Sequence, residues 1–173
     1  MTEATMTGVT AGAKARFLES YRREVATTLK VLRAYPSEQG DMRPHPTSMS
    51  ARELAWVFTI EQGACIAAIR DELPMPPPAP PAPPATFGEC VTAFEGAAEQ
   101  LASLVEATPE AALSETFEFF VAPQTLGPVP KMDLLLTMLN DQIHHRGQLS
   151  VYLRMTGSKV PSIYGPSRDE PWF

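Results

Sequence analysis

The stretch Pro74–Pro84, PMPPPAPPAPP, decides the fold, because it holds eight of the 18 prolines in the chain. Proline lacks an amide hydrogen and clashes with the preceding helical turn, so this stretch cannot be helical. The segments on either side are rich in Ala, Leu, Glu and Gln and nearly free of proline. The pattern predicts long helices that are separated by proline-marked connections.

Apolar residues at helical spacing predict four such helices. They are expected to cover Ala11–Ala34, Ser50–Leu73, Phe87–Ala107 and the segment from Pro130 to about Gly157. Ser50 and Glu53 have the spacing of a capping box at the start of the second helix. Four amphipathic helices of this length predict an all-α fold, a four-helix bundle.

The proline stretch also predicts how the helices are connected. Eleven residues of polyproline II reach about 34 Å, which is about the length of a helix of 23 residues. Residues 74–85 can therefore run back along the bundle as a crossover, so that the second and third helices are parallel. A flexible surface loop and a ligand for a proline-recognising module are the alternatives. The crossover is favoured because a helical hairpin needs only a few connecting residues.

Two other segments lie outside the helices. Ala111–Pro130 is expected to be an extended loop packed by Phe117, Phe119 and Phe120, because a lone strand would have no partner. Pro161–Pro166, PSIYGP, is expected to form a turn that folds back over the end of the bundle.

Length and composition restrict the class of protein. A chain of 173 residues with 44% apolar residues predicts a single domain over 1–173, with residues 1–10 as a flexible tail. A net charge of -6 without a basic run argues against nucleic-acid binding. There is no apolar run of membrane-spanning length and no signal-peptide core near the N-terminus, so a cytoplasmic protein without membrane contact is expected.

The fourth predicted helix carries a candidate site. Asp141 and His145 lie four residues apart, which places both side chains on one face of a helix. This face is expected to be an apolar stripe with His145 near its centre; its members are Leu134, Met138, Asp141, His145, Leu149 and Tyr152. Burying a carboxylate is costly unless it is paired or binds a metal.

The second helix offers a complement to this pair. Glu61 lies in the middle of an apolar stripe, and the small residues Ala64 and Ala68 beside it allow a close helix approach. Glu61, Asp141 and His145 could hold a divalent metal and leave positions open for water or substrate. Alternatively, Asp141 and His145 form a purely structural hydrogen bond, and Glu61 pairs with Arg146 or reaches the rim of the bundle.

Several segments resemble the DinB-like (DinB/YfiT) family. They are Asn140–Met155, NDQIHHRGQLSVYLRM; Val160–Glu170, VPSIYGPSRDE; and Arg43–Pro46, RPHP, which leads into the second helix. The resemblance covers most of the chain, and the string HHRGQL-x-x-YLR is its most specific part. It implies a four-helix bundle with up-down-down-up connectivity, in agreement with the predicted crossover.

The metal site of the family consists of three histidines, and this chain departs from it. His145 matches the last ligand, but Asp141 stands at the ligand position four residues earlier, and Val57 or Trp56 at the position on the second helix. The only other histidines of the chain are His45 and His144, which do not match. Aspartate can replace histidine as a ligand, whereas valine cannot. Glu61, one turn after Val57, is the candidate replacement.

Two functions follow from the resemblance. One is a divalent-metal-dependent enzyme, of thiol transferase or hydrolase type, with a degenerate site for Zn, Ni, Mn or Fe and a small-molecule substrate. The other is a metal-free homodimeric binding or stress-associated bundle without catalysis.

Overall fold

The computed structural model describes residues 12–173, so the predicted tail at 1–10 lies outside the described residues. The long helices are α1 (Ala13–Ala34), α2 (Ala51–Ile69), α3 (Phe87–Ala107) and α5 (Lys131–Met155). The short elements are the 3-10 helix η1 (Ser37–Gln39), the helix α4 (Glu110–Leu113) and the strands β1 (Thr116–Ala122) and β2 (Thr125–Pro130). The chain is thus mostly helical, with a small two-stranded sheet.

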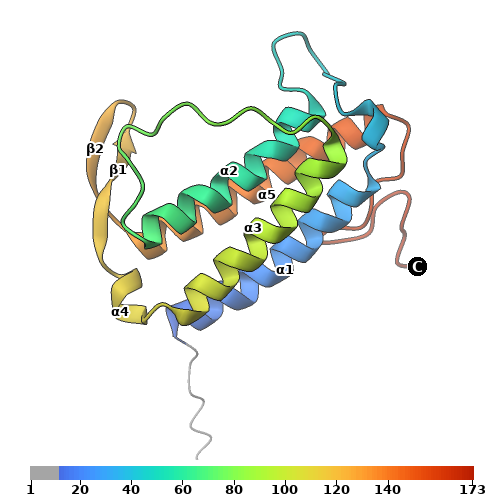
Figure 1. The fold of residues 1–173 in the computed structure, drawn as a ribbon. Coiled ribbons are helices and arrows are strands. Elements are labelled where there is room, and N and C mark those ends of the chain that lie inside the picture. Colours follow the sequence, from blue (N-terminus) through green and yellow to red (C-terminus); the bar gives the residue numbers. More distant parts are fainter. Residues whose placement is uncertain (1–11) are drawn as a thin grey trace, which may run out of the picture.

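The four long helices lie side by side (Figure 1). α2 packs against α3 and α5, and α1 packs against the same two helices, so α1 and α2 occupy opposite corners of the arrangement. The proline-rich segment leaves the end of α2 and runs back over the helices to the start of α3 (Figure 1). α2 and α3 consequently run in the same direction, as the reach of this segment predicts.

Side chains of α2 hold the crossover in place. The indole Nε1 of Trp56 donates a hydrogen bond to the carbonyl oxygen of Pro81 at 2.8 Å. The guanidinium of Arg52 donates to the carbonyl oxygen of Pro84 at 2.9 Å. Prolines have no N–H, so their carbonyl oxygens are the backbone groups that can fasten such a segment.

Capping explains where α2 begins and ends. The predicted capping box of Ser50 and Glu53 is confirmed. The helix ends at Ile69, earlier than the predicted Leu73, because Asp71 adopts a left-handed conformation with φ 61°. The buried Lys131 donates to the carbonyl oxygen of Ile69 at 3.4 Å and pairs with Asp71 at 2.8 Å. A cation at this position stabilises the carboxyl end of the helix.

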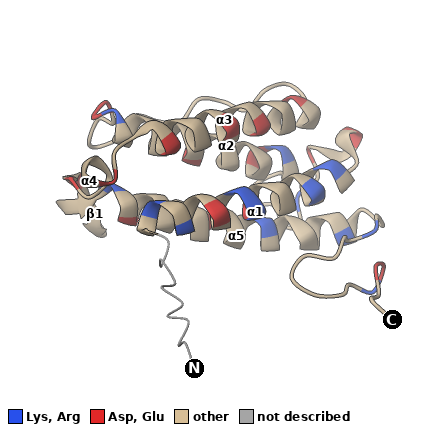
Figure 2. Ribbon diagram, turned by 90° about the horizontal axis from the view of Figure 1, so that it is seen from below, with Lys and Arg blue, Asp and Glu red and all other residues tan. Residues whose placement is uncertain are grey.

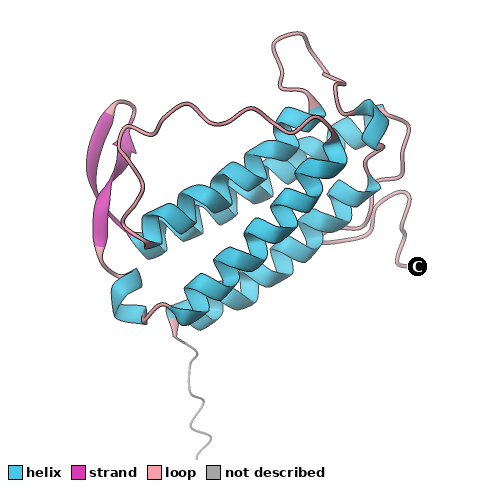
Figure 3. Cartoon of the chain, viewed as in Figure 1, coloured by secondary structure: helices cyan, strands magenta, loops and turns pink. Residues whose placement is uncertain are grey.

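The expectation of a loop at 111–130 is wrong, and the chain is mostly helical with a small two-stranded sheet rather than purely helical. β1 and β2 form an antiparallel hairpin at one end of the helices (Figure 3). Its turn is made by Pro123 and by Gln124, which has a positive φ of 58°. β2 contains Pro128 and Pro130, which are tolerated because proline can stand on an edge strand whose N–H positions face outward. The strand-like segment 116–121 therefore does have a partner.

Charges on α1 are balanced by acidic residues of neighbouring segments. Basic positions outnumber acidic ones along this helix (Figure 2). The ion pairs are Arg22 with Glu106 at 2.7 Å, Arg33 with Glu95 at 2.6 Å and Lys30 with Glu170 at 2.7 Å.

Among the described residues, no helix is long and apolar enough to cross a membrane.

Candidate metal centre

The face of α5 that enters the core differs from the predicted stripe. Gln142 and Arg146 are buried, whereas the side chain of Asp141 is 48% exposed and that of His145 is 14% exposed. α1 explains this rotation, because it places Glu24 opposite Arg146, with an ion pair of 2.8 Å. His145 therefore lies on the flank of the core, at the seam with α2, rather than at its centre.

The structure brings the three predicted ligands together at this seam. Nε2 of His145 lies 3.6 Å from Oε1 of Glu61 and 3.5 Å from Oδ1 of Asp141. One ligand atom from each residue lies within 4.8 Å of the others. Asp141 and His145 share a helix face, and antiparallel packing of α2 places Glu61 opposite them.

Glu61 is the unusual member of this cluster. It is 5% exposed, and neither carboxylate oxygen has a hydrogen-bond partner among the described residues. Burial, followed by the nearby charge of Asp141, raises the pKa of the Glu61 carboxyl to about 9. The predicted alternative of an ion pair with Arg146 is wrong, because Arg146 pairs with Glu24.

Gln148 orients the histidine and was missed by the sequence analysis. Its side-chain oxygen lies 3.0 Å from Nδ1 of His145, and its side-chain nitrogen lies 3.0 Å from Nε2 of His144. With this amide orientation Nδ1 of His145 donates, so in the neutral imidazole the lone pair lies on Nε2, the nitrogen next to the two carboxylates. The i,i+3 spacing of His145 and Gln148 on one helix was the available signal.

Other residues considered in the sequence lie away from the cluster. His45 is exposed and its Nδ1 lies 2.8 Å from Oγ1 of Thr47. Trp56 is engaged with the crossover, and Val57 lines a hollow beneath that crossover. Cys65, one turn after Glu61, is buried, and burial followed by the charge of Glu61 raises the pKa of its thiol. The Cys65 thiol therefore stays protonated and poorly nucleophilic.

The cluster fits a divalent cation. Two ligands of one metal, each about 2.1 Å from it, lie roughly 3 to 4 Å apart, which is close to the separations of His145 from both carboxylates. A cation would supply the partner that the oxygens of Glu61 lack. The exposed Asp141 marks the side on which water or a substrate can enter.

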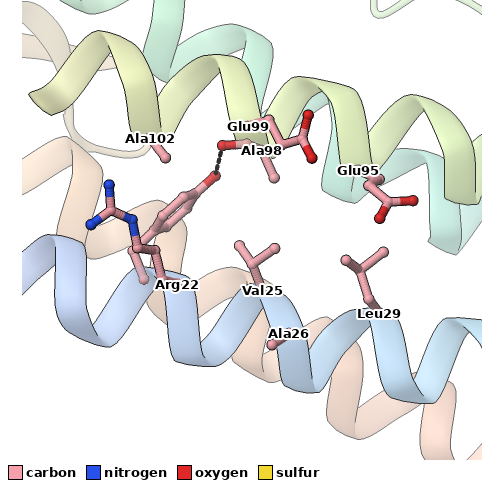
Figure 4. Close-up of a pocket in the computed structure, with 9 residues that line it drawn as sticks. Arg22, Val25, Ala26, Leu29, Glu95, Ala98, Glu99 and Ala102 are labelled. Carbon is pink, nitrogen blue, oxygen red and sulfur yellow. Dashed lines mark hydrogen bonds between the residues drawn. The ribbon is translucent and has the colours of Figure 1, made fainter. Parts of the chain in front are cut away.

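A hollow of about 250 Å³ lies elsewhere, between α1 and α3 (Figure 4). Val25, Leu29 and Ala98 line it, and the hydroxyl of Tyr21 donates to the carbonyl oxygen of Ala98 at 3.3 Å. Because α1 and α3 form the side of the helix arrangement opposite α2 and α5, this hollow does not adjoin the candidate centre.

Fold and cluster together define a helical protein with a buried carboxylate and a histidine facing each other across two helices. A family model, described as the DinB family, matches residues 4–172. The chain belongs to the DinB family.

Individual relatives agree with this assignment. The uncharacterized protein YrdA of Bacillus subtilis (strain 168) is 26% identical over 161 residues, which cover 89% of each chain. A DinB-like protein of Bacillus cereus ATCC 10987 has a crystal structure with a TM-score of 0.71 and 22% identity, covering 86% of this chain and 95% of that one. YjoA, a DinB-like protein of B. subtilis, gives a TM-score of 0.67 and 19% identity, covering 86% and 96%. The two solved structures show the DinB-like fold.

Proposed function

We propose that this chain is a divalent-metal-dependent enzyme of thiol transferase or hydrolase type, with Glu61, Asp141 and His145 as the metal ligands. The proposal includes one domain over 1–173, a four-helix bundle with up-down-down-up connectivity, and a small-molecule substrate. One observation carries it: the buried carboxyl of Glu61 has no hydrogen-bond partner among the described residues and lies 3.6 Å from Nε2 of His145. Such a group is costly in the apo protein and is stabilised by a bound cation.

Each residue has a distinct role in this proposal. A divalent metal supplies a positive charge that lowers the pKa of a bound water or thiol. His145 offers a neutral nitrogen, and Gln148 holds its ring. Asp141 stands at the solvent side, where a substrate enters. Glu61 supplies the third ligand or acts as a general base on the substrate.

The ligand set narrows the choice of metal to test first. The family site has three imidazoles, whereas this cluster has two carboxylates and one imidazole. Carboxylate oxygens suit Mn²⁺, and imidazole suits Zn²⁺, Ni²⁺ and Fe²⁺. Replacing imidazole by carboxylate therefore shifts the preference toward Mn²⁺ within the group of Zn, Ni, Mn and Fe.

Metal content tests the proposal directly. Tag-free protein is purified, reloaded with each of the four metals in turn, dialysed and analysed by mass spectrometry. Wild type is expected to hold one equivalent, and Glu61→Gln and His145→Ala are expected to hold none. His45→Ala is the matched control, because His45 is exposed and contacts Thr47 instead of the cluster. A wild type without stoichiometric metal, or a Glu61→Gln variant that binds as well, would overturn the proposal.

A metal-free homodimeric binding protein is the second candidate function. The hairpin favours it, because Phe120, Val121 and Leu126 are exposed apolar residues at its tip. Sedimentation of the metal-free protein tests this function. A dimer that Val121→Glu converts into a monomer supports it, and a monomeric wild type contradicts it.

A further inference from the structure

A hollow of about 430 Å³ lies between the crossover and the amino-terminal half of α2. Trp56, Val57 and Ile60 form its floor on α2, and Pro80, Pro81 and Pro83 line it from the crossover. Its volume falls within the range of small-molecule pockets. The hydrogen bond from Trp56 to Pro81 fastens the crossover above the floor.

Apart from its carbonyl oxygens and the amide of Ala82, the crossover side of this hollow is apolar. Prolines present ring carbons and no N–H groups, and the carbonyl oxygen of Pro81 already accepts the indole hydrogen of Trp56. The floor adds an indole ring and two branched aliphatic side chains. Surfaces of this kind bind aromatic or branched aliphatic groups through apolar contact.

The two charged residues in the lining are paired with each other. NH1 of Arg43 lies 2.8 Å from Oε2 of Glu53, and NH2 of Arg43 donates to Oε1 at 3.0 Å. Arg43 also donates to the carbonyl oxygen of Ser48 at 2.6 Å. A charged ligand group would be desolvated here without a free counter-ion in the lining, so the hollow favours an uncharged group.

Two residues relate the hollow to the candidate metal centre, although none of the three candidate ligands lines it. Val57, on its floor, lies one helical turn before Glu61 on α2. A second hollow, of about 480 Å³, shares Thr47, Ser48 and Met49 with the first and is lined by Gln148. Gln148 in turn contacts His145.

We propose that the hollow beneath the proline-rich crossover binds an uncharged aromatic or branched aliphatic group of the substrate, whose reacting group extends toward Glu61, Asp141 and His145. This inference deepens the proposed function and rests on it for the second part. Binding of the apolar group does not require the metal, so the two parts can be tested separately.

The first experiment measures binding to the metal-free protein. Benzyl alcohol, benzoate and benzylammonium are titrated while the indole N–H signal of Trp56 is followed by NMR; the other tryptophan of the chain is Trp172. Benzyl alcohol is expected to shift the signal saturably in the millimolar range typical of fragments. The two charged probes are expected to bind at least about tenfold more weakly. Equal binding of all three, or no saturable shift, would overturn the proposal.

Variants that fill one of the hollows with a larger side chain test where benzyl alcohol binds. Ile60→Trp fills the hollow and is expected to weaken benzyl alcohol binding at least about tenfold. Ala102→Trp, which fills the hollow between α1 and α3 instead, is the matched control and is expected to leave binding unchanged. Equal loss in both variants, or no loss in either, contradicts the assignment. The comparison of charged and uncharged probes on wild type needs neither variant to fold.

The second experiment tests the link to the metal centre. Protein loaded with Mn²⁺ is expected to broaden the proton signals of bound benzyl alcohol, whereas Glu61→Gln with the same Mn²⁺ is not. Saturable binding of benzyl alcohol by a protein that takes up neither Mn²⁺ nor any of the other three metals would refute the proposed metal function and leave the apolar site standing. Mn²⁺ uptake without benzyl alcohol binding would refute the apolar site alone. If benzyl alcohol and Mn²⁺ both bind but the proton signals are not broadened, the hollow does not lie next to the metal centre. This result would contradict the proposed link between them.

Discussion

Glu24 on α1 and Glu61 on α2 are buried to the same degree, at 4% and 5% exposure, but they meet opposite surroundings. Glu24 receives the guanidinium of Arg146 at 2.8 Å and a hydrogen bond from the hydroxyl of Tyr164 at 2.6 Å. Burial acts to raise the pKa of Glu24, but these hydrogen bonds and the charge of Arg146 outweigh it and hold the pKa below its usual value.

Glu61 has no donor of this kind among the described residues. Burial, together with Asp141, raises the pKa of Glu61 to about 9. The comparison teaches that the chain can neutralise a buried carboxylate with its own residues and does so at Glu24. At Glu61 no cationic side chain of the described residues does so, and the carboxyl lies beside a histidine, where the proposed metal would bind.

The largest expected effect comes from removing the partner of Glu24. Arg146→Met leaves the Glu24 carboxylate buried with Tyr164 and the exposed Arg23, 3.6 Å away, as its remaining partners, and is expected to lower the free energy of unfolding by about 3–5 kcal/mol. Urea denaturation at neutral pH measures the change. The double variant Glu24→Gln with Arg146→Met is the control and should be more stable than Arg146→Met. A loss below about 1 kcal/mol would show that the pair is not the main partner of either group.

Replacing Glu61 is expected to change the free energy of unfolding in the opposite direction. Glu61→Met removes an unsatisfied buried carboxyl and is expected to stabilise the metal-free protein by about 1–3 kcal/mol, while it abolishes metal binding. Glu24→Met, its matched control, should destabilise the protein. Thermal unfolding in the presence of a chelator compares the two. If both variants change stability in the same direction, the contrast between the two glutamates fails.

Replacing Gln148 is expected to have a smaller effect, which concerns metal affinity and not the stability of the metal-free protein. Gln148→Ala removes the acceptor for Nδ1 of His145 and should weaken metal binding about 10–100-fold. Because Gln148 is exposed, the metal-free stability should change by less than about 0.5 kcal/mol. Calorimetric titration with Mn²⁺ measures the affinity. Gln148→Glu keeps an acceptor at this position and should retain binding, whereas equal loss in both variants would argue against an orienting role.

The smallest effect is expected at Tyr164, and it depends on pH. Tyr164→Phe removes the hydrogen bond that the hydroxyl donates to Glu24 and the one that it accepts from Arg146, and should cost about 1–1.5 kcal/mol at pH 7. Since the pKa of Glu24 is lowered in the folded state, its contribution to stability is present above the unfolded value of about 4.5. It is lost as the pH falls through the folded pKa. The difference from wild type in urea denaturation should therefore shrink between pH 5 and pH 3.

Tyr152→Phe is the control for this pH series, because Tyr152 donates to the carbonyl oxygen of Met49, which does not titrate. Its cost should stay constant over the same pH range. A constant cost for Tyr164→Phe as well would mean that the hydrogen bond does not act through the charge of Glu24.

Local signals predicted much of the fold. The proline stretch and the capping box at Ser50 act within a few residues, and the helix at Phe87–Ala107 lies where it was predicted. The hairpin was missed because no partner was recognised for 116–121; the partner strand contains Pro128 and Pro130, which weaken a strand pattern. Whether a proline is tolerated depends on which edge of the strand lies free, and sequence spacing does not show this.

In the candidate site, too, the local features could be predicted from the sequence and the long-range ones could not. The i,i+4 spacing placed Asp141 and His145 together, and the small residues around Glu61 indicated where α2 approaches. The rotation of α5 could not be predicted, because Arg146 is buried through its pairing with Glu24, which lies 122 positions away in the sequence. When a charged residue pairs with a buried residue far away in the sequence, it is buried itself, and residues of the predicted apolar stripe can then be exposed.

The crossover also divides the candidate centre along the chain. Glu61 precedes it, and Asp141 and His145 follow it. A chain cut once within the exposed residues 76–80 would give two fragments, each with two long helices and an incomplete ligand set. Neither fragment would bind the metal alone, whereas their mixture would regain binding on association. The two fragments would therefore form a complementation pair, and metal binding would report their association.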